Sequence, residues 1–139
     1  MEKMNKEQLI AAVKQVPSVA SDERWVLTLD RNEGALFYSP EIIPDGAELH
    51  QVTDEYSLYV DKDFRPRGVM VEYYDNNFIQ HHPEFKVMSP KVFGSGAVVE
   101  PKDDGKNEDT LVFRALFEKT LIAEAVSGHI PPHMQTETK

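Results

Sequence analysis

The sequence contains no cysteine among its 139 residues. Disulfide frameworks, thiolate nucleophiles, iron–sulfur clusters and cysteine-built zinc sites are therefore excluded, and several classes of enzyme with them. Long apolar runs are also absent, since no uncharged stretch approaches the ~20 residues needed to cross a bilayer. The polar residues 1–8 do not resemble the start of a secretory signal. We therefore expect a cytoplasmic protein with no membrane segment.

Basic residues are few, since 15 lysines and arginines face 24 aspartates and glutamates, which gives a formal net charge of −9. A field of this sign repels phosphate backbones, and the basic residues are scattered along the chain, so nucleic-acid binding is not expected. The same acidity would suit a regulator that neutralises a basic protein partner.

The clearest pattern that is present lies in residues 56–82, where β-branched and aromatic residues alternate with polar ones between turn-forming clusters. This alternation predicts three consecutive antiparallel strands, with turns at residues 61–67 and at Asn76-Asn77. The register of the second hairpin would place Glu72 opposite His81. Shorter strands are expected at residues 24–30, 35–39, 48–52 and 97–100.

Two further segments show the apolar spacing of helices. The first, residues 5–16, is expected to end at Pro17. The second, residues 108–127, is apolar around most of its circumference. One sheet face would cover only one of its apolar ridges, so this helix would lie between the sheet and the N-terminal helix or form a homodimer interface. The ridges are Phe113, Phe117 and Leu121 on one side and Leu111, Val112, Ala115, Ile122 and Val126 on the other.

These elements predict an α+β fold, in which an antiparallel sheet of about five strands, arranged as a meander, is packed by an N-terminal helix and a longer C-terminal helix. Residues 1–129 would form a single domain. Residues 130–139 would form a flexible tail, because they are polar and follow two prolines.

Titratable side chains converge around Glu72, His81 and His82 in the predicted sheet. Glu72 and His81 would serve as acid and base in a small hydrolase or isomerase, or would form a surface salt link of small energetic value. Successive strand residues point to opposite faces, so His81 and His82 are not expected to share a metal ion. We predict no metal site and no cofactor.

A contact surface for a peptide or a second subunit is the other candidate site. Met70, Tyr74 and Ile79 would be exposed on the second face of the sheet, with His82 beside them. The alternative is that the terminal helices cover this face, in which case these side chains belong to the core.

Three other motifs lack a necessary part. Residues 61–72 have acidic groups at relative positions 1, 3 and 12, as in a calcium-binding loop, but Arg65 and Pro66 replace an oxygen ligand and the turn glycine. The histidines at positions 129 and 133 are separated by two prolines, which prevent a shared helix face. Residues 94–96 lack the lysine and the longer glycine pattern of a phosphate-binding loop.

Two pairs of segments carry a resemblance to a known family. They are Leu27-Thr-Leu-Asp30 with Ala35-Leu-Phe-Tyr-Ser39, and Tyr59-Val-Asp-Lys-Asp63 with Gly68-Val-Met-Val-Glu72. These segments resemble a family of short bacterial β-meander domains of uncharacterised function, and the resemblance implies a compact antiparallel sheet but no activity. The C-terminal helix and residues 40–46 depart from that family.

The sequence therefore favours a non-catalytic binding or protein-interaction module. The alternatives are a small acid–base enzyme using Glu72 and His81 and an acidic regulator that binds a basic protein.

Overall fold

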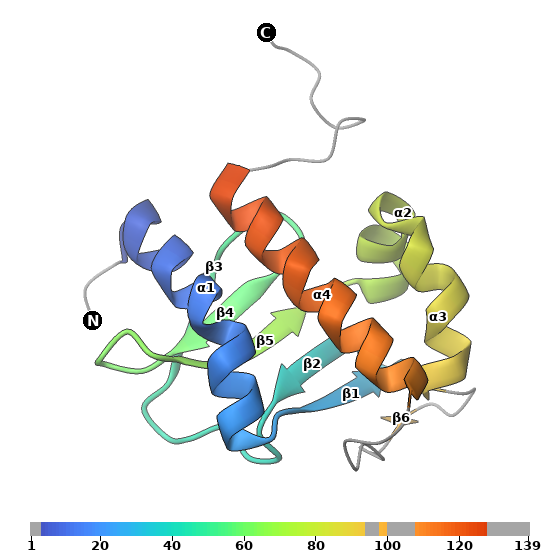
Figure 1. Cartoon of the computed structure of the whole chain (residues 1–139), viewed down its shortest axis with the longest axis horizontal. Helices are drawn as coiled ribbons and strands as arrows, with labels where there is room; N and C mark the ends of the chain where they lie inside the picture. Colours follow the sequence, from blue (N-terminus) through green and yellow to red (C-terminus); the bar gives the residue numbers. More distant parts are fainter. Residues whose placement is uncertain (1–3, 94–97, 100–107, 128–139) are drawn as a thin grey trace, which may run out of the picture.

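The computed structural model of the chain describes residues 4–93, 98–99 and 108–127. Several features singled out in the sequence lie outside the described residues, namely the predicted tail at 130–139, the glycine-containing segment 94–96 and the histidines at 129 and 133. In the described part the helices gather on one side of a single antiparallel sheet (Figure 1).

The sheet confirms the predicted fold class. Its strands follow the order β3-β4-β5-β2-β1-β6, and every pair of neighbours is antiparallel. The five longer strands form the predicted sheet, and the two-residue β6 extends it at the edge beside β1. The strands are β1 (Val26–Asp30), β2 (Ala35–Ser39), β3 (Glu48–Gln51), β4 (Ser57–Val60), β5 (Pro66–Val71) and β6 (Val98–Val99).

Aspartates organise two of the tight connections. Between β1 and β2, Asp30 Oδ1 accepts hydrogen bonds from the backbone N–H groups of Asn32 and Glu33, at 3.0 and 3.1 Å. Between β4 and β5, Asp61 Oδ1 accepts hydrogen bonds from the N–H groups of two following residues, at 2.9 and 3.1 Å. Residues 61–65 therefore form a polar hairpin connection of the kind that aspartate favours, and the last two residues of the predicted turn begin β5.

The predicted third strand of the meander is wrong. Strand β5 ends at Val71, and Tyr73 adopts the left-handed conformation, with φ 54° and ψ 47°. The chain then turns into η1 (Tyr74–Phe78), α2 (Ile79–His81) and α3 (Pro83–Phe93), which places Asn76-Asn77 inside a π-helical turn. The third strand of the meander is instead β3, which pairs with the other edge of β4. Glu72 is consequently not opposite His81.

Apolar spacing explains why this segment is helical. Tyr74, Phe78 and His82 recur at intervals of four residues, which is the repeat of one helix face. Tyr74 and Phe78 are fully buried, and their rings stack at a centroid distance of 5.8 Å. Burial of this aromatic face outweighs the strand propensity of the individual residues.

Helix α1 (Lys6–Glu23) begins as predicted but continues through Pro17. Its start is a capping box, in which the Asn5 side chain accepts the N–H of Gln8 and the Gln8 side chain accepts the N–H of Asn5. The buried stripe continues past the proline with Val19 and Ala20, which are 4% and 0% exposed. This packing sustains the helix beyond the position where local sequence would end it.

Helix α4 (Glu108–Ser127) lies across the core face of the sheet, with α1 along one flank and α3 along the other (Figure 1). Phe113, Phe117 and Leu121 are fully buried beneath it. On its outer surface Leu111 and Val112 are 44% and 54% exposed in the single chain. The homodimer through this helix stays a prediction. No helix in the described part of the chain is long and apolar enough to cross a membrane.

Candidate functional site

Two buried carboxyl groups and an imidazole meet where the β3–β4 connection, the α2–α3 corner and α4 come together. Nε2 of His82 lies 2.7 Å from Oε1 of Glu55 and 2.5 Å from Oε2 of Glu124. Glu55 is 2% exposed and Glu124 is 3% exposed. We call these three residues the carboxylate–histidine cluster. Ionisable side chains are seldom this deeply buried unless they are paired, so the cluster is the strongest candidate site in the described residues.

The backbone on both sides of Glu55 is fixed to α4. The N–H of Glu55 donates to Oγ1 of Thr53 at 3.1 Å, and that hydroxyl donates to Oε1 of Glu124 at 3.3 Å. On the other side, the Tyr56 hydroxyl donates to the carbonyl oxygen of Leu121 at 2.7 Å. These bonds hold the segment that carries Glu55 against the helix that carries Glu124 without the help of a ligand.

His82 is positioned by the end of α2. It is the C-cap residue of that helix, and its N–H donates to the carbonyl oxygen of Phe78 at 2.9 Å. Its ring packs on the Phe78 ring at a centroid distance of 4.6 Å. The side chain keeps 15% exposure, so it is the most accessible of the three groups in the cluster.

His81 and His82 both reach Glu55. Nδ1 of His81 pairs with Oε2 of Glu55, and Nε2 of His82 faces Oε1 of the same carboxylate. The expectation that these histidines point to opposite faces depended on a strand, and the helical end of α2 with its cap residue removes that restriction. Each oxygen of Glu55 therefore has its own imidazole partner.

The cluster shifts the pKa values of its three members. Burial raises the pKa of Glu55, but its neighbours His82, Glu124 and His81 outweigh burial and lower the value to about 2. Burial lowers the pKa of His82, but the adjacent carboxyl groups of Glu124 and Glu55 raise it to about 9. Burial and the neighbouring Glu55 raise the pKa of Glu124 to about 7. The site thus pairs an ionised carboxylate with an imidazolium and a carboxyl group that titrates near neutrality.

A cavity of about 440 Å³ opens beside the cluster along α4. His82 and Glu124 belong to its wall, and most of the remaining wall comes from one side of α4. These α4 residues are Leu116, Lys119, Thr120, Ala123 and Ser127. The buried titratable groups are therefore in contact with a space that a small ligand can enter.

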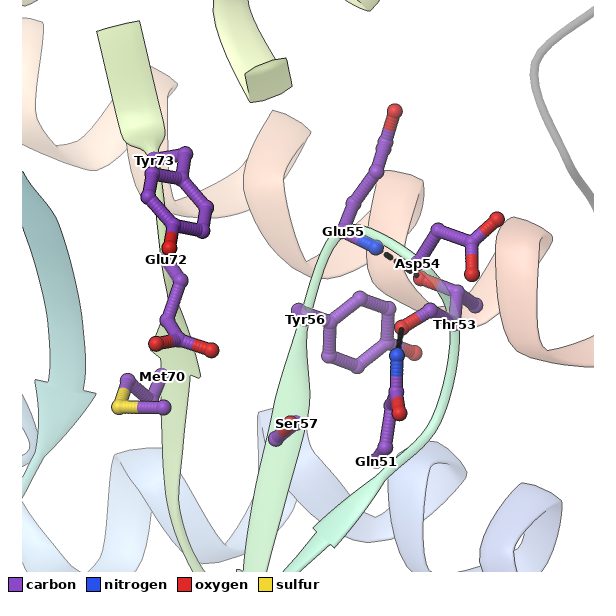
Figure 2. A pocket seen from close by; sticks show the side chains of 9 residues that line it. All are labelled: Gln51, Thr53, Asp54, Glu55, Tyr56, Ser57, Met70, Glu72 and Tyr73. Carbon is purple, nitrogen blue, oxygen red and sulfur yellow. Dashed lines mark hydrogen bonds between the residues drawn. The ribbon is translucent and has the colours of Figure 1, made fainter. Parts of the chain in front are cut away.

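A second cavity, of about 250 Å³, lies at the ends of strands β3, β4 and β5 and includes Glu72 and Met70 (Figure 2). Glu55 also borders it, but Figure 2 shows the Glu55 side chain extending away from Glu72. Glu72 thus lines this second cavity, whereas His81 pairs with the Glu55 carboxylate of the cluster. The structure does not bring together the Glu72 and His81 pair considered from the sequence.

The residues expected to form a contact surface are mostly interior. Tyr74 is fully buried, and its hydroxyl lies 2.6 Å from Oγ of Ser89. Ile79 is 6% exposed. Met70 is half-buried on the face of the sheet opposite α4, and His82 belongs to the cluster. Tyr74 and Ile79 therefore present no exposed surface to a partner.

Sequence reasoning missed Glu55 and Glu124. Glu124 had a signal, because it follows Leu121 by three residues and Phe117 by seven, which puts a carboxylate on the buried ridge of α4. Glu55 had none, since it follows Asp54 in a polar turn and the groups around it, such as His81 and His82, come from distant segments.

The carboxylate–histidine cluster is also where a metal ion would fit. Glu55, His82 and Glu124 each offer one ligand atom, and these atoms all lie within 4.8 Å of one another. The resemblance to β-meander domains stays a prediction. No protein-family description, curated protein or solved structure matches this chain.

Proposed function

We propose that this protein is a non-catalytic binding module whose ligand occupies the cavity between α4 and the α2–α3 corner. The observation that carries the proposal is the contact between this cavity of about 440 Å³ and the buried carboxylate–histidine cluster. Ligand pockets typically combine an apolar wall with a few convergent polar groups and perturbed pKa values.

The wall favours a small molecule with an apolar body and a polar head. Leu116 and Ala123 supply the apolar part of the wall, where the ligand body would lie. His82 and Glu124 supply the hydrogen-bonding groups that would hold the head, and Lys119 adds a positive charge. The volume lies in the range of about 300–1,000 Å³ that small-molecule sites occupy.

Acid–base catalysis at the same cluster is the second candidate function. It is favoured by the pKa of Glu124, which burial and the adjacent Glu55 raise to about 7, because a general acid or base works best near the operating pH. In that case His82 and Glu124 would take the roles considered for His81 and Glu72. The Glu124→Gln variant would then abolish turnover of a bound compound while leaving its binding in place.

Two alanine-to-tryptophan substitutions on α4, one in the cavity wall and one outside it, test the binding function. Ala123 lines the cavity and Ala115 does not, although both are exposed on α4. We expect Ala123→Trp to fill the cavity and to remove thermal shifts produced by small-molecule ligands in a metabolite screen. Ala115→Trp should leave those shifts unchanged. Ligand shifts that survive Ala123→Trp in full would overturn the proposed site.

A further inference from the structure

We propose that Glu55, His82 and Glu124 bind a divalent first-row transition metal ion, with its open coordination positions directed into the cavity along α4. This inference rests on the proposed function, because the ion would be the group that holds the polar head of the ligand. It contradicts the sequence-based expectation of no metal site, which assumed that His81 and His82 lie on a strand.

The three donor atoms lie close together. Nε2 of His82 is 2.7 Å from Oε1 of Glu55 and 2.5 Å from Oε2 of Glu124, and all three donors lie within 4.8 Å of one another. Ligands bound to an ion at ~2.0–2.2 Å in a tetrahedral arrangement are roughly 3.3 Å apart. The two nitrogen–oxygen distances therefore need to widen by less than about 1 Å to admit the ion, which lies within the reach of side-chain rotation.

One donor atom lacks a satisfactory partner within the described part of the chain. Oε2 of Glu124 is buried and makes no hydrogen bond of acceptable direction, although His82 Nε2 is close to it. Nε2 of His82 can carry only one proton, and Oε1 of Glu55 competes for it at 2.7 Å. A buried carboxylate oxygen in this state is costly, and a cation bound between the three donors would satisfy it.

The residues behind the donors resemble the outer shell of a metal site. His81 pairs with the second oxygen of Glu55, and Thr53 donates its hydroxyl to the second oxygen of Glu124 at 3.3 Å. Each carboxylate therefore keeps one oxygen for a neighbouring side chain and turns the other toward His82. Such outer partners orient the ligating oxygen and are a regular part of metal sites.

The donor set selects the class of ion. One imidazole nitrogen with two carboxylate oxygens suits zinc, iron, cobalt or manganese, whereas calcium and magnesium prefer oxygen ligands alone. Three protein ligands leave at least one position for water or for a ligand atom, as in zinc sites that act on bound molecules. His82 and Glu124 both line the cavity, so that position faces it.

The test measures ion binding by the full chain after treatment with a chelator. Titration calorimetry with Zn²⁺ should show one bound ion per chain, and Co²⁺ should give the visible absorption of a low-symmetry site. Ca²⁺ and Mg²⁺ should not compete. Because these measurements use the unaltered protein, they do not depend on whether a variant folds.

Substitutions test whether the ion binds at the carboxylate–histidine cluster. We expect Glu124→Gln to abolish the site, and His81→Gln to weaken Zn²⁺ binding by about 10–100-fold because His81 only orients Glu55. The matched control is Glu118→Gln on the same helix, since Glu118 contacts Tyr38 and lies outside the cluster. All variants should also carry His129→Ala and His133→Ala, which removes ion binding by those two histidines.

The outcomes separate this inference from the proposed function. Zn²⁺ binding that is equal in the Glu124→Gln and Glu118→Gln proteins, or that disappears with the changes at 129 and 133, would overturn the metal site. If no ion binds while Ala123→Trp still removes small-molecule shifts, the binding module stands without the metal. If one ion binds at the cluster and no compound enters the cavity, the metal site stands and the proposed function fails.

Discussion

The hydroxyl of Tyr56 donates a 2.7 Å hydrogen bond to the backbone carbonyl oxygen of Leu121. Tyr56 directly follows Glu55, and Leu121 lies on α4 one turn before Glu124, so this bond joins the two segments that carry the buried carboxyl groups. Both residues are interior, at 2% and 0% exposure.

Removing this bond should destabilise the protein measurably. Tyr56→Phe keeps the ring and leaves a buried carbonyl without its side-chain donor, so we expect a loss of about 1–2 kcal/mol in the free energy of unfolding. Urea unfolding followed by circular dichroism measures it. Tyr59→Phe, on the half-buried opposite face of the sheet, should change the same quantity by less than about 0.5 kcal/mol. Equal effects of the two substitutions would contradict the role given to Tyr56.

Gly68 allows β5 and β2 to approach closely. A Cβ atom at this position would lie 2.9 Å from Cβ of Ser39, closer than packed atoms tolerate. Gly68→Ala should therefore lower the free energy of unfolding by about 1–3 kcal/mol. In the double variant Gly68→Ala with Ser39→Gly the clash is relieved, so the combined loss should be smaller than the sum of the single losses. Additive losses in urea titrations would argue against this contact.

Glu23 should contribute stability that disappears in acid. Partial burial raises its pKa, but hydrogen bonds from Trp25, Arg67 and Arg65 outweigh burial and lower the pKa below the ordinary 4.5. A lowered carboxyl pKa gives stability that is present above pH 4.5 and is lost as the pH falls through the folded-state value. Melting temperatures of wild type and Glu23→Gln should differ above pH 5 or so and converge toward lower pH. A difference that widens in acid would have the wrong sign for this ion pair.

Pro17 should weaken the helix that contains it. Within α1 a proline cannot donate a backbone hydrogen bond and its ring crowds the preceding turn. We expect Pro17→Ala to raise the free energy of unfolding, by up to about 3 kcal/mol. The neighbouring exposed substitution Ser18→Ala should stay within about 0.5 kcal/mol of wild type. If thermal unfolding shows Pro17→Ala to be neutral or destabilising, the proline instead fits this helix without strain.

The parts of the fold that were predicted correctly from the sequence are those whose apolar residues follow a single spacing, either that of a strand or that of a helix. Strand β1 follows strict alternation, with Leu27 and Leu29 buried and their neighbours half-buried. Helix α4 carries Phe113, Phe117 and Leu121 at intervals of four. In both cases the local pattern and the tertiary packing favour the same structure, so the local pattern was sufficient.

The segment after β5 was mispredicted because two periods overlap there. Aromatic residues and asparagines in residues 73–78 fit a hairpin, but Tyr74, Phe78 and His82 also fit one helix face. The choice depends on burial against α3 and α4, where Phe78 packs on Phe117 at a centroid distance of 5.8 Å. Those contacts join distant parts of the chain and are not encoded in any short window.

The carboxylate–histidine cluster escaped prediction for the same reason. Its members come from a turn, a helix cap and the last helix, and only their docking makes them neighbours. From the sequence, His82 was the one member named as a candidate, and it was grouped with Met70, Tyr74 and Ile79. A carboxylate on an otherwise apolar helix face, as at Glu124, is the signal that sequence reasoning should have followed.

Thr53 and Glu124 are hydrogen-bonded although they stand 71 positions apart in the chain. The carboxylate–histidine cluster therefore forms only after the last helix has docked, and a folding intermediate in which α4 is undocked has no site for a ligand. Any ion or molecule bound there stabilises the folded protein, because it binds the native state and not a partly folded one. Occupancy of the cluster by a ligand would thus indicate that folding is complete. Loss of the ligand would let the end of α4 unfold before the rest of the structure.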